Sequence, residues 1–242
     1  MELFNLINYS LYNSIIGRSY RKILRVFERN KNINKAQYGE MVVNDVMKLN
    51  YNYFPMFGTL LSLHRDGRFV FADDFDFAII GDFPEDIIST FERNGYQLCA
   101  LSLIGNKREI IEYSFSKKIK NEYIKVDIFK LKEVNNIIRH SCPNFRKEKE
   151  FVRFRDGLKI CQFNSYFTVD YPKFDLTVSK WGIKIPNNPD DIFELHYGHD
   201  WEIPKTSNFI DFSAYRFIAE RSETVLGSSE KLKEYIKNNM SC

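Results

Sequence analysis

Apolar side chains recur every three or four positions near the start of the chain. This spacing predicts an amphipathic helix over residues 3–27, and the second half of that helix is rich in arginine and lysine. A polar linker follows at residues 30–35. We therefore expect a basic helical segment and its linker over residues 1–35, followed by a larger domain over residues 36–242.

The rest of the chain changes between helical and strand-like patterns. Helical spacing at residues 37–49 is followed by an extended segment, and Thr59 is suited to cap a helix over residues 59–65. Pro84 favours the first turn of a helix that ends near residue 94. Strand-like and further helical patterns then predict strands at residues 69–80, 96–103, 110–115 and 124–131, a strand-rich stretch at 151–185, and a helix from about residue 214 to 238.

This order of elements predicts an α+β fold with a central mixed sheet flanked by helices. A doubly wound fold would show regular alternation of strand and helix, and the predicted elements do not alternate in this way. The length of 242 residues allows one domain with a full core. The aromatic content of 16% fits aromatic-rich strands.

Charge and cysteine content exclude several classes of protein. The formal net charge of +3 is too small to indicate a nucleic-acid partner. Residues 104–160 hold 15 Lys/Arg against 8 Asp/Glu, which predicts either a solvated basic face or a surface that meets a phosphorylated donor, an anionic glycan or an anionic membrane. The four cysteines and four histidines have neither zinc-ligand nor disulfide-framework spacing.

No apolar run approaches the roughly 20 residues that cross a bilayer. We therefore expect a soluble or at most peripheral protein, and the absence of a disulfide framework favours the reducing cytoplasm. The N-terminal helix either packs on the domain or attaches it peripherally to the inner face of the cell membrane or to a partner such as a glycosyltransferase.

Three aspartates carry the candidate chemistry. Asp74 and Asp76 stand two apart in a strand-like segment, so both carboxylates project from one face. Asp127 is a single acid in a later apolar strand pattern, and it joins them if the two strands are neighbours. Adjacent buried anions repel, and Mg²⁺ or Mn²⁺ relieves that repulsion with oxygen ligands. Such a triad can bind two metal ions for displacement at phosphorus, and one carboxylate can take the proton of the attacking hydroxyl.

Gly58 and Thr59 strengthen this hypothesis, because an acidic pair alone is common on surface strands. Glycine permits close approach of the backbone, and the threonine hydroxyl stands at a predicted helix N-terminus, where free N–H groups can hold a phosphate. Arg65 either neutralises a donor diphosphate or is a surface cation.

From about residue 54 to 204 the chain resembles the LicD/fukutin family, a branch of the nucleotidyltransferase-like fold. The resemblance rests on the motifs Phe57-Gly58-Thr59-Leu60-Leu61, Asp73-Asp74-Phe75-Asp76-Phe77, Val126-Asp127-Ile128-Phe129 and Leu195-His196-Tyr197-Gly198-His199-Asp200-Trp201-Glu202-Ile203-Pro204, with Arg65, Gly67 and Phe69 between the first two.

The resemblance implies a phosphotransferase. Similar proteins move phosphocholine or an alditol phosphate from a CDP-activated donor to a sugar hydroxyl of a cell-surface glycan, with a divalent metal held by the acidic pair and a later aspartate. It implies Asp74, Asp76 and Asp127 as catalytic metal ligands, with Asp74 favoured over Asp73 because it keeps the alternating register. Gly58, Thr59, Arg65 and Asp73 would then contact the donor.

Several alternatives stay open. Tyr197 and Trp201 either form a packed turn or supply a ledge for stacking of a sugar or base. The same fold also transfers a nucleotide from an NTP to a small molecule or protein. A non-catalytic glycan-assembly subunit is the remaining alternative, and the presence of all three aspartates counts against it.

Overall fold

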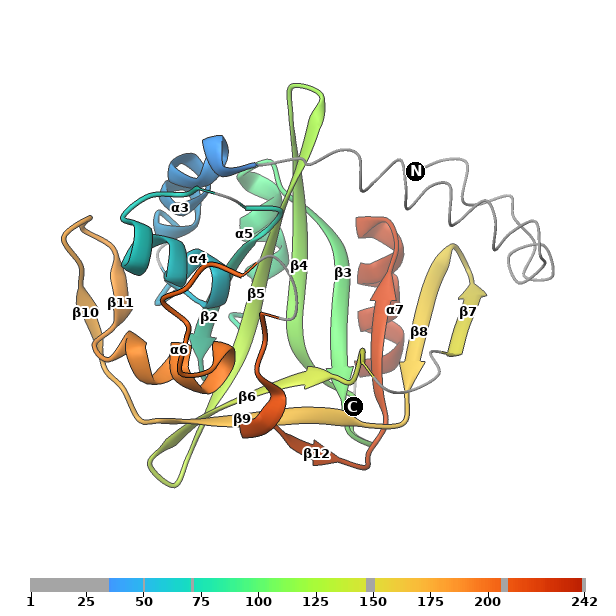
Figure 1. The fold of residues 1–242 in the computed structure, drawn as a ribbon. Coiled ribbons are helices and arrows are strands. Elements are labelled where there is room, and N and C mark those ends of the chain that lie inside the picture. The colour runs from blue at the N-terminus through green and yellow to red at the C-terminus, as the bar shows by residue number, and fades with distance from the viewer. Residues whose placement is uncertain (1–34, 50, 71, 147–150, 206–208, 241–242) are drawn as a thin grey trace.

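The computed structural model describes residues 35–49, 51–70, 72–146, 151–205 and 209–240. Their fold is mixed α+β, as predicted, and is built on a large, curled, mostly antiparallel sheet (Figure 1). The helix predicted over residues 3–27 lies outside the described residues.

Among the described residues, eleven strands form one sheet. Nine follow one another in the order β12-β9-β6-β5-β4-β3-β13-β8-β7, and β2 pairs with both β1 and β5. A separate pair is formed by β10 and β11. The strands are β1 (Phe54–Pro55), β2 (Phe75–Ile80), β3 (Gln97–Ile104), β4 (Glu109–Ile119), β5 (Glu122–Val134), β6 (Ile137–Pro143), β7 (Phe151–Arg155), β8 (Leu158–Phe163), β9 (Tyr166–Pro172), β10 (Leu176–Val178), β11 (Lys184–Pro186), β12 (Arg216–Ile218) and β13 (Ser222–Leu226).

Strand β5 joins the two parts of the sheet. Residues 122–129 pair antiparallel with β4, and residues 126–131 pair parallel with β2 on the opposite edge. The last residues of β5, 132–134, pair with β6 instead. In Figure 1, β6, β9 and β12 therefore run across the lower ends of β3, β4 and β5.

Helices cover the sheet in two places. Helices α5 and α7 pack on β3, whereas α4 packs on β2 and contacts α6. The helices are α3 (Gly39–Met47), α4 (Phe57–Leu61), α5 (Ile87–Arg93), α6 (Pro189–Tyr197) and α7 (Ser229–Met240). The shorter turns are η2 (Ala36–Tyr38), the π-helical η3 (Ser62–Asp66) and η4 (Phe212–Ala214).

The core has two main parts. The larger lies under α3, α5 and α7, where Val46 and Phe91 pack on buried side chains of β2 to β5 such as Phe115. Phe91 and Phe115 stack with ring centroids 4.1 Å apart. The smaller part lies between β1, β6, β9 and α6, around Phe54 and Val169.

The C-terminal region differs from the helix predicted over residues 214–238. Apart from the last residue of η4, Ala214, only α7 is helical there, and β12 and β13 precede it. Strand β13 lies between β3 and β8 and pairs with both, and Val225 is fully buried. Burial in a central strand outweighs a weak helical pattern, because strand formation depends on cross-strand packing.

Two predicted boundaries are also wrong. The strand predicted over residues 69–80 begins only at Phe75, after a bend at residues 73–74. The helix expected to open at Pro84 begins at Ile87, whose N–H donates to the Pro84 carbonyl in a preceding turn. Strand β6 and helix α6 were not among the predicted elements.

A candidate metal centre of three carboxylates

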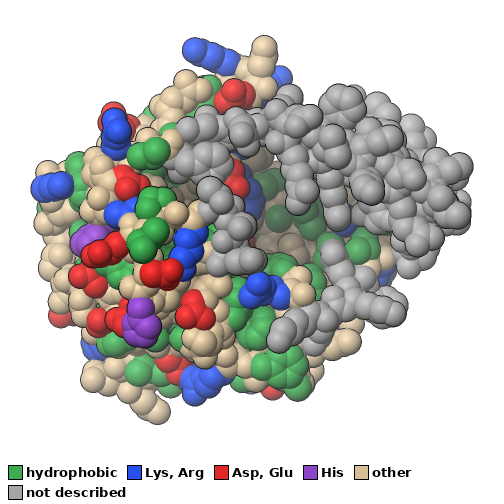
Figure 2. Space-filling model, viewed as in Figure 1, with side chains coloured by type: hydrophobic (Ala, Val, Ile, Leu, Met, Phe, Trp, Pro, Cys, Tyr) green, Lys and Arg blue, Asp and Glu red, His purple; other side chains and the backbone are tan. Residues whose placement is uncertain are grey.

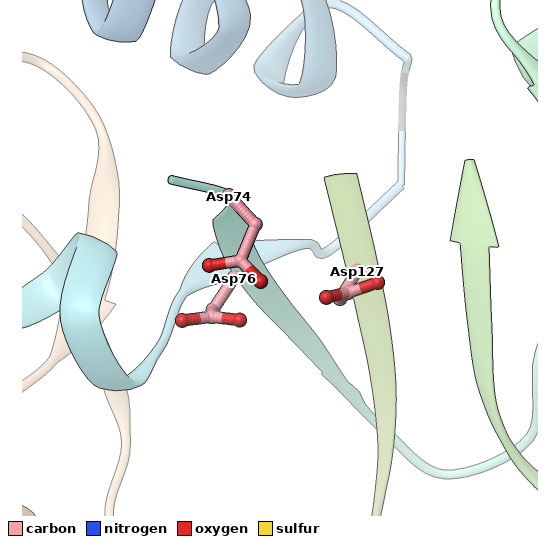
Figure 3. Close-up of side chains that lie close together, drawn as sticks. All are labelled: Asp74, Asp76 and Asp127. Atoms are coloured by element: carbon pink, nitrogen blue, oxygen red, sulfur yellow. The ribbon is translucent and has the colours of Figure 1, made fainter. Parts of the chain in front are cut away.

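Parallel pairing of β2 with β5 brings the three aspartates together. Asp76 and Asp127 are direct partners in the register of these strands, and Asp74 stands just before β2. One carboxylate oxygen of each residue lies within 4.8 Å of one oxygen of the others. Figure 3 shows the three side chains on the same side of the strand pair, beside the start of α4. The predicted convergence of the triad is therefore present.

Thr59 connects α4 to the strand that carries Asp76. The prediction that Thr59 caps this helix is wrong, because α4 begins at Phe57 with Met56 as its N-cap. Instead, the Thr59 hydroxyl accepts a hydrogen bond of 2.7 Å from the backbone N–H of Asp76. The Met56 N–H donates to the Asp76 carbonyl at 3.0 Å. The backbone N–H and carbonyl of Asp76 are therefore both hydrogen-bonded to the segment that opens α4.

Phe57 holds the turn into α4 in a strained conformation. Its φ of +45° is unusual for a bulky residue, and its ring stacks on buried His196 of α6 with centroids 4.4 Å apart. The next residue, Gly58, then lies against the cluster. A Cβ at Gly58 would stand 3.6 Å from Asp76 Oδ2, so a side chain larger than a methyl group would enter the carboxylate cluster.

Burial and mutual repulsion disfavour ionisation of this cluster. Burial raises the pKa of Asp74 to about 7, and the charges of Asp127 and Asp73 add to the effect. Burial, followed by the charges of Asp74 and Asp127, raises the pKa of Asp76 well above its usual range. Without a further cation, full ionisation of the three acids is therefore costly.

Two charged residues at the cluster were not singled out by the sequence. The Lys125 ammonium donates to Asp127 Oδ2 at 2.7 Å and lies 3.9 Å from Asp74 Oδ2. Glu112, on β4, is close enough that the Asp127 charge adds to the effect of burial and raises the Glu112 pKa to about 7. Lys125 was detectable, because it stands two residues from Asp127 on one strand. Glu112 was not, because its placement depends on the β4–β5 register.

Asp127 is the best-suited ligand of the three. The residue is 3% exposed, and among the described residues its Oδ1 has no hydrogen-bond partner. A buried polar atom without a partner is costly and rare. Hard divalent cations such as Mg²⁺ and Mn²⁺ take carboxylate oxygens as ligands. The residues present therefore fit a divalent cation, which Asp74, Asp76 and Asp127 would hold.

Two of the residues predicted to contact the donor, Arg65 and Asp73, lie outside the carboxylate triad. Arg65 is turned toward Asp66, to which Nε and Nη2 donate at 2.9 and 3.0 Å, and its Nη1 donates to the Trp201 carbonyl at 3.3 Å. It thereby links η3 to the loop after α6. Asp73 is exposed and outside the carboxylate triad, whereas Asp74 belongs to it.

Tyr197 and Trp201 pack around the end of α6. Tyr197 is buried, and burial, together with the nearby Asp76 charge, raises its pKa well above its usual range. Trp201 packs on Phe193 with ring centroids 4.9 Å apart. Gly198 ends the helix at a φ of +90°, where a side chain would be strained. Packing thus accounts for the positions of both aromatic rings. A role for them in substrate binding stays a prediction.

Two cavities lie outside the triad. One of about 420 Å³ opens beside Tyr197 and is lined by Asp200, Lys205 and Asp211 among others. The other, of about 610 Å³, lies against β6, β9 and β12 and contains four basic side chains from Lys107, Lys132, Arg139 and Arg216. Figure 2 shows that acidic and basic side chains are interspersed over the described surface around α4 and α6.

Comparison with known protein families, with curated proteins and with solved structures gave no match. The candidate site is therefore interpreted from its own geometry. No helix in the described part of the chain is long and apolar enough to cross a membrane.

Proposed function

We propose that this chain is a metal-dependent phosphotransferase that moves a substituted phosphate, such as phosphocholine or an alditol phosphate, from a CDP-activated donor to a glycan hydroxyl. The carrying observation is the triad of Asp74, Asp76 and Asp127, in which buried Asp127 Oδ1 lacks a partner among the described residues. The choice of donor rests on the resemblance to the LicD/fukutin family, and so does the proposed nucleotidyltransferase-like fold.

The triad suits phosphoryl transfer because that reaction needs mainly positioning and charge neutralisation. When bound, Mg²⁺ or Mn²⁺ supplies positive charge to the donor diphosphate. The acceptor hydroxyl oxygen forms a bond to the phosphorus that carries the organic group. The bond from that phosphorus to the CMP oxygen breaks, and CMP leaves with the electron pair.

The chain's own residues have distinct tasks in this scheme. Thr59 fixes the backbone of Asp76, and Gly58 leaves room for the donor beside the carboxylates. A triad carboxylate takes the proton of the attacking hydroxyl. Lys125 supplies a positive charge within 2.7 Å of Asp127.

The donor class sets the proposed location. CDP-linked donors are cytoplasmic metabolites, so we place the enzyme in the cytoplasm, with peripheral attachment at the inner face of the membrane or to a glycosyltransferase through residues 1–35. No nucleic-acid partner is proposed, because the net charge is only +3.

Product analysis tests this function. The full chain is incubated with Mg²⁺, a mixture of glycan acceptors, and CDP-choline, CDP-glycerol or CDP-ribitol in turn, and CMP is measured by chromatography. Acceptor-dependent CMP release from one donor supports the proposal, provided that Asp76→Asn abolishes it. Pyrophosphate release from an NTP, with no CMP from any CDP-linked donor, would show nucleotidyl transfer instead.

A further inference from the structure

Lys125 contacts two of the three acids in the carboxylate cluster. It stands two residues before Asp127 on β5, so both side chains leave the same face of the strand. Its ammonium is 2.7 Å from Asp127 Oδ2 on β5 and 3.9 Å from Asp74 Oδ2 just before β2, and thus bridges these two acids. A two-metal centre would add a second positive charge beside such carboxylates, and the Lys125 ammonium already supplies one there.

The charges around Lys125 keep its ammonium in this place. Its Nζ donates a hydrogen bond to Asp127 and forms an ion pair with Asp74, so two acids hold the ammonium between them. Glu112 adds a fourth acid beside the cluster, so the acidic groups there outnumber the one lysine.

The oxygens that Lys125 leaves free define one remaining cation position. Lys125 uses Asp127 Oδ2, whereas Asp127 Oδ1 has no partner among the described residues. Asp76 lies beside Asp127 in the strand register and has no ion pair with a described residue within 4.0 Å. One oxygen of each of Asp74, Asp76 and Asp127 lies within 4.8 Å of the others. A cation shared by the three and bound to Asp127 through Oδ1 would leave the Lys125 hydrogen bond to Oδ2 in place.

We propose that the Lys125 ammonium takes the place of a second metal ion, so that the cluster binds a single divalent cation. This inference rests on the proposed function, because it requires the triad to be a metal centre. It revises the two-ion arrangement that such a triad can adopt. Lys125 then provides the second positive charge for the donor diphosphate, from a fixed position on the sheet.

Metal stoichiometry tests this inference without an activity assay. Mn²⁺ bound per chain is measured by equilibrium dialysis and metal analysis at neutral pH, for the wild type and for Lys125→Met, which keeps the length of the side chain and removes its charge. Lys125→Arg retains the charge. Lys130→Met is the matched control on the same strand, because Lys130 pairs with Asp82 and Glu109, outside the triad.

The expected result is one Mn²⁺ per chain for the wild type, Lys125→Arg and Lys130→Met, and two for Lys125→Met. Two ions in the wild type, or one ion in Lys125→Met with cooperative unfolding intact, would overturn the role of Lys125 and leave the metal centre standing. No Mn²⁺ in the wild type would overturn the metal centre itself, and with it both this inference and the proposed function.

Discussion

Two strands of the sheet each bury an acid, and the two acids have opposite surroundings. Glu223 on β13 is 2% exposed and Asp127 on β5 is 3% exposed. Three arginines and a tyrosine surround Glu223. Arg108 donates to it at 2.7 Å, the Tyr235 hydroxyl donates at 3.2 Å, and Arg153 and Arg221 complete the set.

The surroundings of Asp127 show a deficit of positive charge instead. Lys125 is the single described cation within 4.0 Å of Asp74 and Asp127, and Asp76 has none among the described residues. One oxygen of Asp127 has no hydrogen-bond partner among the described residues. Burial therefore costs far more at the triad than at Glu223, where it is compensated by charge and hydrogen bonds.

This difference separates a structural acid from a binding acid. A buried carboxylate with more than enough cations has its interactions completed by the fold. A buried group of carboxylates with too few cations is stabilised only by protonation or by a ligand cation. The predictions below test this contrast, beginning with the largest expected effect.

Replacing Asp127 by Asn should reduce the rate of CMP release on the order of 10³-fold, because the cation loses its most buried ligand and metal stabilisation of the transition state is worth several kcal/mol. The rate is measured with the donor that the wild type uses. Asp82→Asn is the matched control, because Asp82 is exposed and pairs with Lys130 outside the triad. A rate within tenfold of wild type for Asp127→Asn would contradict the metal assignment.

Replacing Glu223 by Gln should destabilise the fold by about 3 kcal/mol, because the arginines lose the carboxylate that compensates them. We place the effect at the lower end of the range for buried pairs, since the arginines are 26 to 52% exposed. Urea unfolding with and without Mg²⁺ measures it. The loss should be the same in both conditions. A loss that Mg²⁺ removes would mean that Glu223 also belongs to a metal site.

Replacing Asp76 by Asn should stabilise the metal-free fold, whereas replacing Glu223 by Gln destabilises it. In EDTA at pH 8, the variant should be more stable than wild type by about 1 kcal/mol, because one of three repelling carboxylates is neutral. Excess Mg²⁺ should reverse the order, since a ligand that binds only the folded state stabilises it. Equal destabilisation of Asp76→Asn with and without Mg²⁺ would show that Asp76 has a structural role.

The pH dependence should give the smallest effect, because the Asp74 side chain is 37% exposed and solvent screens its charge. The pKa of Asp74 is about 7 in the folded chain and near 4 when unfolded, so between these values the folded state binds more protons. The contribution of Asp74 to the free energy of unfolding of the metal-free protein should therefore be fully present below about pH 4. It should be lost as the pH rises through 7. Urea unfolding in EDTA at pH 5 and pH 8 measures the trend. A free energy of unfolding that rises from pH 5 to pH 8 would contradict the raised pKa of Asp74.

The sequence was sufficient for the three aspartates but not for their neighbours. Alternation around Asp76 and Asp127 predicted the strands, and their parallel pairing, on which the site depends, was stated only as a condition. Glu112 and the connection of Thr59 to Asp76 depend on contacts between separate segments, 17 residues apart in the second case. Local patterns do not contain such contacts.

The fold shows the same limit. Long strands such as β4 and β5 were predicted because their own residues alternate. Strand β13 was predicted as helix, because its conformation is decided by pairing with β3 and β8, more than 50 residues away in sequence. Phe57 could not be assigned its positive φ from sequence, since the ring of His196 that packs on it belongs to a distant helix.

The central claim is that the triad, and not the Glu223 cluster, binds a divalent cation. Anomalous X-ray diffraction from crystals grown with Mn²⁺ tests it most directly. We predict one anomalous peak about 2.1 Å from oxygens of Asp76 and Asp127, beside the Lys125 ammonium, and none at Glu223. A structure at millimolar Mn²⁺ with no peak among Asp74, Asp76 and Asp127 would contradict the account.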